Sequence, residues 1–125
     1  MITHIQGKLV EKNPSFVIID CNGIGYFLRI SLQTFSKLSN DEHCMLFTHL
    51  SIKEDAHTLY GFFDKDEREL FRLLISVSGV GPNTAQMILS SLTPNEIQQA
   101  ILTENVSVLQ GVKGIGGKTA QRIIL

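Results

Sequence analysis

The C-terminal half of the chain contains an internal repeat, which constrains its fold more than any other feature. Residues Ser78–Leu89 align with Lys113–Ile124 at a constant offset of 35 residues. The residues identical at that offset are Gly79/Gly114, Gly81/Gly116, Thr84/Thr119, Ala85/Ala120, Gln86/Gln121 and Ile88/Ile123. Because self-similarity at a fixed spacing marks a repeated structural unit, the pattern predicts two copies of a helix, a Gly-hydrophobic-Gly turn and a second helix.

Each Gly-hydrophobic-Gly turn is expected to bind an anion. Two glycines permit a sharp reversal, and we expect Val80 and Ile115 to point between the helices and anchor the turns. The second helix begins directly after each turn, so its first amides lack intrahelical acceptors and its dipole favours negative charge. The expected ligand is the DNA backbone, bound without regard to base sequence. The expected contact residues are Gly79, Val80, Gly81, Asn83, Thr84, Gly114, Ile115, Gly116, Gly117, Lys118 and Thr119, with Lys113 and Arg122 as supporting cations.

The charge of the chain fits binding through backbone amides better than binding through charge. The formal net charge is −1, which argues against a protein that coats duplex DNA electrostatically. From Leu73 onward the only charged side chains are Lys113, Lys118, Arg122, Glu96 and Glu104. The alternative that both turns merely connect helices remains open, although a plain helix–helix turn does not require a glycine pair twice over.

The N-terminal half has the pattern of β-structure. The β-branched runs at 15–20 and 24–31 flank Asn22-Gly23, which is typical of a type I′ hairpin turn. Further strands are expected at 2–10, 44–53 and 57–63, with a short helical turn at 32–38. Five short strands in antiparallel order suggest a Greek-key barrel such as an OB-fold. Another kind of five-stranded barrel remains open.

At Asp64 the hydrophobic period changes from 2 to 3.6. Asp64–Glu67 is predicted to form a capping box, as is Thr93–Glu96, which has Pro94 at the first helical position. We place the domain boundary near residue 63. The predicted fold class is α+β, with a five-stranded OB-fold barrel at 1–63 and an all-α tandem helix-hairpin-helix domain at 64–125.

No catalytic residue, metal or cofactor is expected. The segment ending in Gly117-Lys118-Thr119 resembles a Walker A loop, but Val112 stands where that motif requires glycine, so ATP hydrolysis is not predicted. The four histidines have no metal-site spacing, and Cys21 and Cys44 are expected to stay reduced. With no signal peptide or membrane-spanning run, a cytoplasmic location is expected.

The whole chain, 1–125, resembles the RuvA family of Holliday-junction recognition subunits. The segments that carry the resemblance are 23–26, 47–49, 54–56, 59–62, 67–71, 79–82 and 114–116. It implies a non-catalytic subunit that holds a four-way junction open for branch migration in recombination, DNA repair and the SOS response. It further implies a homotetramer assembled through the barrel, one subunit per junction arm, with a RuvB-type ATPase and a RuvC-type resolvase as partners. Whether one tetramer or two, an octamer, encloses the junction stays open.

The resemblance also gives a role to Glu54 and Asp55, which match the acidic pin of the family, a loop placed near the crossover. Carboxylates repel phosphates, so the pin would favour separated strands at the centre. Without the resemblance, the segment 53–57 reads as a solvated turn.

Two features depart from the family pattern. Asn83 stands where lysine is common, and the third, ATPase-contacting domain is expected to be absent, which leaves engagement of the ATPase open. Two other functions also remain open: the DNA-binding fragment of a helix-hairpin-helix nuclease or glycosylase, and a protein-assembly module.

Overall fold

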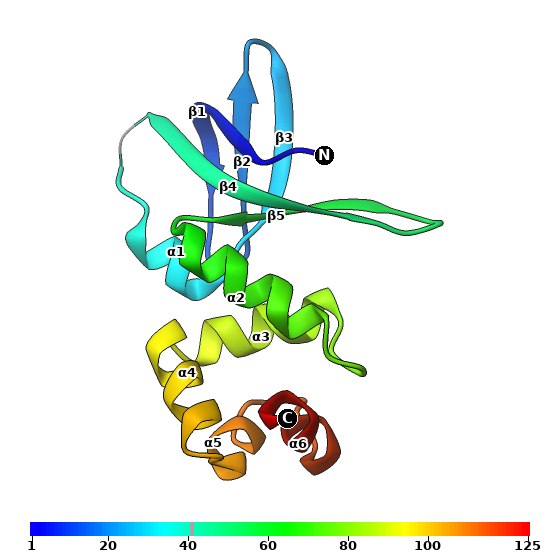
Figure 1. Cartoon of the computed structure of the whole chain (residues 1–125). Coiled ribbons are helices and arrows are strands. Elements are labelled where there is room, and N and C mark those ends of the chain that lie inside the picture. Colours follow the sequence, from blue (N-terminus) through cyan, green and yellow to red (C-terminus); the bar gives the residue numbers. More distant parts are fainter. Residues whose placement is uncertain (41) are drawn as a thin grey trace. The chain divides into compact units, whose positions relative to one another are not determined.

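The computed structural model describes residues 1–40 and 42–125 of the chain (Figure 1). Contacts divide these residues into two compact units, Met1–Arg68 and Glu69–Leu125, and each is described by itself. The division falls inside helix α2 (Lys65–Ile75), beyond the boundary placed near residue 63 from the sequence. The first turn of α2 belongs with the barrel because the side chains of Glu67 and Arg68 bond to barrel residues.

The N-terminal unit is a closed five-stranded barrel. Its elements are β1 (His4–Lys12), β2 (Phe16–Cys21), β3 (Ile24–Arg29), α1 (Leu32–Lys37), β4 (His43–Ile52) and β5 (His57–Phe62). The strands close in the order β1-β2-β3-β5-β4, and α1 lies between β3 and β4 along the chain. This is the arrangement of an OB-fold, so the α+β class and the barrel predicted from the sequence are confirmed.

One strand pairing differs from the expected antiparallel order. Strands β3 and β5 are parallel, with Leu28 opposite Leu59, whereas the other four pairings are antiparallel. The reason is geometric: directions cannot alternate around a closed ring with an odd number of strands, so at least one neighbouring pair must be parallel.

The turn between β2 and β3 has the conformation that the sequence predicts. Asn22 and Gly23 have φ angles of 52° and 96°, which are the two positive values that a type I′ turn requires. The carboxylate of Asp20 accepts a hydrogen bond from the Gly23 amide at 2.8 Å. The hairpin therefore sets the strand register that places Val17, Ile19 and Leu28, each with 0% exposure, in the barrel core.

The predicted capping box at Asp64–Glu67 is wrong. The Glu67 carboxylate accepts hydrogen bonds from the Ser31 hydroxyl at 2.8 Å and the Thr34 hydroxyl at 2.5 Å, and it is buried. Asp64 instead forms an ion pair with Lys37. Glu67 bonds to these distant residues rather than to the start of its own helix because a buried carboxylate must be hydrogen-bonded. Helix α1 with its N-cap supplies two hydroxyl donors for it. Burial nevertheless raises the pKa of Glu67, against the lowering effect of the two hydroxyl bonds.

The C-terminal unit continues with α3 (Pro82–Ser91), α4 (Pro94–Leu102), α5 (Val106–Gln110) and α6 (Gly117–Ile124). The capping box predicted at the start of α4 is confirmed, with Thr93 and Glu96 bonding reciprocally at 3.1 and 3.0 Å. Ala85 on α3 and Ala120 on α6 are fully buried, as expected where small side chains let helices pack closely.

Candidate nucleic-acid interface

The turn before α3 is the first of the two predicted anion sites. Gly79 adopts a φ of +88°, which glycine tolerates and side-chained residues rarely adopt. Val80 follows with 4% exposure, and its amide donates to the Val77 carbonyl at 3.0 Å. Gly81 is the N-cap of α3, with φ −89° and ψ 175°. The burial of the Val80 side chain fits the anchoring role expected for it.

The turn before α6 repeats this geometry closely. Gly114 has a φ of +90°, and Gly116 is the N-cap of α6 with φ −85° and ψ 171°. Ile115 is 7% exposed, and its amide donates to the Val112 carbonyl at 3.1 Å. The duplication seen in the sequence is thus a duplication of backbone conformation.

The two glycines of each turn serve different purposes, which sequence reasoning did not separate. Only Gly79 and Gly114 have the positive φ that a sharp reversal needs. Gly81 and Gly116 are in extended backbone that any residue adopts, and a Cβ built on either would meet nothing within 4 Å. The fold does not require these two glycines. They leave open space directly in front of a helix N-terminus.

The helix N-termini at these turns are uncapped. Neither α3 nor α6 has a side-chain cap, in contrast to α4, which Thr93 caps. In the part of the chain that the structure describes, several backbone amides at these two helix starts donate no hydrogen bond to a protein acceptor. They are the amides of Gly81, Thr84, Gly116, Gly117, Lys118 and Thr119. The first bond inside each helix comes from Ala85 or Ala120. Such amides, together with the helix dipole, suit an anion.

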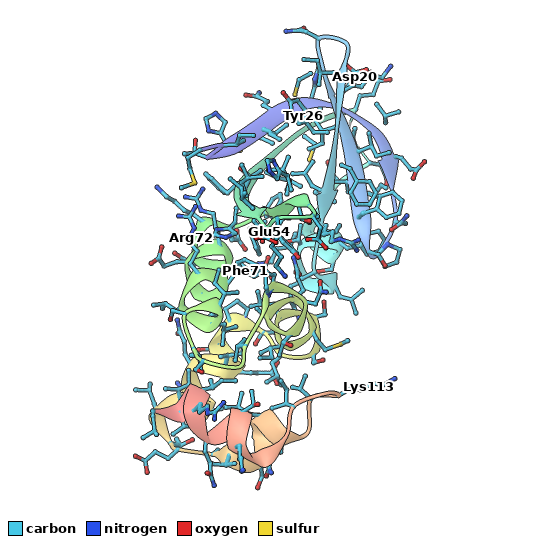
Figure 2. The ribbon with its side chains drawn as sticks, turned by 90° about the vertical axis from the view of Figure 1, so that its right-hand side faces the viewer. Asp20, Tyr26, Glu54, Phe71, Arg72 and Lys113 are labelled. Carbon is cyan, nitrogen blue, oxygen red and sulfur yellow. The ribbon has the colours of Figure 1, made fainter. Side chains whose placement is uncertain are left out.

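The cations of the predicted interface, which are the contact residue Lys118 and the supporting residues Lys113 and Arg122, all come from the second turn and its helix. Lys113, Lys118 and Arg122 are exposed, and Lys113 projects away from the helices at the turn (Figure 2). Arg122 donates from Nη1 to the Ser78 carbonyl at 3.5 Å, so its guanidinium lies at the first turn. The sequence identified Arg122 as a supporting residue but not its place, because spacing along α6 cannot show which neighbouring turn a long side chain reaches.

The predicted acidic pin lies at the tip of the β4–β5 hairpin, which extends beyond the barrel (Figure 1). Lys53 and Ala56 exchange backbone hydrogen bonds of 2.8 and 3.4 Å, so Glu54 and Asp55 form a two-residue loop. Both carboxylates are exposed. Among residues 1–40 and 42–125, no group of three or more His, Cys, Asp or Glu side chains is placed to hold a metal ion.

The two cysteines of the barrel are far from these turns in the sequence. Cys21 and Cys44 are free, and burial raises the pKa of the Cys44 thiol, with Lys12 opposing that shift. The described residues include no helix with both the length and the apolar character needed to cross a bilayer.

Comparison with known proteins gives matches along the whole chain. Residues 1–61 match the family model described as RuvA N terminal domain, and residues 71–125 match SAM-like Helix-hairpin-helix tandem. Proteins named Holliday junction branch migration complex subunit RuvA are similar over all 125 residues. The identity is 62% in Christiangramia forsetii, 58% in Flavobacterium psychrophilum and 54% in Bacteroides thetaiotaomicron. The chain spans 65%, 65% and 62% of the length of these relatives.

Proposed function

Because this chain belongs to the RuvA family, we propose that it binds four-way DNA junctions through its two Gly-hydrophobic-Gly turns. The observation that carries the proposal is the pair of open N-cap positions at Gly81 and Gly116, each in front of uncapped helix amides. A phosphate can approach the backbone there because no Cβ stands in its way. The relatives that match the whole chain are named as subunits of a Holliday junction complex.

The binding of each DNA arm of the junction is independent of base sequence. Amides of Gly81 and Thr84 at α3, and of Gly116 to Thr119 at α6, donate to phosphate oxygens, while Lys113 and Lys118 add charge at the second turn. Gly79 and Gly114 allow the sharp backbone reversal of the two turns, and the side chains of Val80 and Ile115 anchor these turns. Asn83 contributes at the first turn in place of a lysine.

We further propose that four copies assemble through the barrel into a homotetramer, as one tetramer or as two facing each other across the junction. A chain of net charge −1 with two amide sites binds weakly alone, and linked copies gain avidity when their geometry matches the four arms. Glu54 and Asp55 then repel phosphates near the crossover and favour separated strands.

The chain acts as a non-catalytic subunit in the cytoplasm, and a separate RuvB-type ATPase supplies the energy for branch migration. A RuvC-type resolvase shares the junction, in recombination, repair and the SOS response. A nuclease role has little to support it in the C-terminal unit: of the two acidic side chains beyond Leu73, Glu96 is engaged in capping α4.

A titration of the protein against a synthetic four-way junction and a linear duplex of equal length tests the proposal. We expect tighter binding to the junction, with the native mass of the complex corresponding to four or eight copies. Equal affinity for both DNAs would overturn junction selectivity. Cleavage of the junction in Mg²⁺ would support a nuclease instead, and assembly without DNA uptake would support a pure assembly module.

A further inference from the structure

The two turns differ in charge although their backbones match. At the positions where the second copy has Lys113, Lys118 and Arg122, the first copy has Ser78, Asn83 and Met87. The first turn therefore has no cation of its own. Without a further cation, only amides and uncharged side chains would hold a phosphate bound there.

Arg122 lies at this uncharged turn, although it belongs to the second copy. Its Nη1 is 3.5 Å from the Ser78 carbonyl oxygen and 3.0 Å from the position that a Cβ on Gly79 would occupy. The guanidinium therefore lies beside Gly79, and Gly79 is two residues before Gly81, the N-cap of α3. All of these residues belong to the C-terminal unit.

The contact with Ser78 uses only part of the hydrogen-bonding capacity of the guanidinium. Arg122 is exposed, and no carboxylate pairs with it among the described residues. A guanidinium has five N–H donors in a planar fork, and the single long bond to Ser78 engages one of them. The others are available for a phosphate, which a guanidinium can bind through two parallel bonds.

We propose that Arg122 supplies the cation of the first turn, so that one phosphate is held jointly by the α3 amides and a side chain from α6. The bond to Ser78 positions the guanidinium, and the absence of a side chain on Gly79 makes room for it. This inference deepens the proposed function and rests on it. It makes the two turns one interdependent site, because removing α6 would also strip the first turn of its charge.

The test is the salt dependence of junction binding by Arg122→Ala. We expect the dissociation constant to rise at least about tenfold, in line with the loss of a charge-assisted hydrogen bond. The slope of log K against log salt should become shallower by about 0.9 for each phosphate that is no longer neutralised. Arg122→Lys should keep most of the slope. If Arg122 only ties α6 to the Ser78 carbonyl, the melting temperature falls and the salt slope does not change, which would overturn the inference.

A rescue experiment locates the contact. Asn83→Lys places a cation at the first turn, and in the Arg122→Ala background it should restore both affinity and slope. Gln98→Lys, on the exposed side of α4, restores the same net charge elsewhere and should not rescue. Equal rescue by both lysines would contradict a local contact. The unsubstituted protein separates the two claims: if it binds no junction DNA, the proposed function and this inference both fail, whereas junction binding with an unchanged Arg122→Ala slope refutes the inference alone.

Discussion

Within each hairpin, one glycine is needed for the fold and the other is free for the proposed ligand contact. Gly79 and Gly114 have positive φ angles and are needed for the reversal, whereas Gly81 and Gly116 are in ordinary extended backbone with open space around the Cβ position. Both pairs of glycines were predicted from the sequence, but their roles could not be assigned. The sequence does not show whether a glycine is needed for its φ angle or to leave space for a ligand. The division makes the DNA-binding claim separable from stability.

Glu67 is the residue whose environment the sequence predicted least well. Its position suggested a local cap, but its partners Ser31 and Thr34 lie 36 and 33 residues earlier in the chain. Local spacing cannot reveal a tertiary bond of this kind. The Thr34 hydroxyl also accepts a hydrogen bond from the Phe63 amide at 3.2 Å, so the network joins α1, the end of β5 and the first turn of α2 within the N-terminal unit.

The pH dependence of stability should reveal this buried carboxylate. Burial raises the pKa of folded Glu67 above its ordinary value of 4.5, so its stabilising contribution is fully present below that value. The contribution is then lost as the pH rises through the folded pKa. We expect the unfolding free energy of the unsubstituted chain, relative to Glu67→Gln, to fall as the pH rises from 4.5 through the folded pKa.

Urea unfolding at several pH values measures this difference, and Glu69→Gln, on an exposed position of the same helix, serves as the control. A difference between the unsubstituted chain and Glu67→Gln that stays constant or grows with pH would contradict the assigned cause of the shift.

At the level of helices and strands, most elements follow from local signals. Asn22-Gly23 predicted the β2–β3 hairpin, and Thr93 with Glu96 predicted the start of α4, because turns and caps are made by residues close in sequence. The parallel pairing of β3 with β5 has no local signal. It follows only from closure of the barrel, which is a property of all five strands together.

The role in DNA selectivity that we propose for the β4–β5 hairpin can be tested by removing its charge. Replacing Glu54 and Asp55 with Gln and Asn removes two exposed negative charges from a tight loop without altering its length. We expect linear duplex to bind several-fold more tightly, because a phosphate about 4 Å from each carboxylate no longer meets roughly 1 kcal/mol of repulsion in water. Junction affinity should change less, so selectivity falls. Competition between the two DNAs gives the ratio, and an unchanged ratio would contradict the pin assignment.

Across the whole molecule, the charge and the repeat point to binding by geometry. A net charge of −1 leaves little general attraction for DNA, so the proposed affinity rests on amides held in place and, in the proposed tetramer, on several copies acting together. The repeat predicted the paired turns, and their matching φ angles bear out the duplication. The reach of Arg122 across to Ser78 was not predictable, because it depends on how α6 packs beside the first turn.

The most direct test of the central claim is the junction affinity of the double variant Gly81→Ala, Gly116→Ala. Each methyl group enters empty space in the protein but stands where a phosphate would approach. We predict an unchanged melting temperature and a dissociation constant raised at least about tenfold, equivalent to about 1.4 kcal/mol. Gly114→Ala should instead lower stability, by about 1–2 kcal/mol of backbone strain. A double variant that folds normally and binds the junction as tightly as the unsubstituted chain would contradict the account.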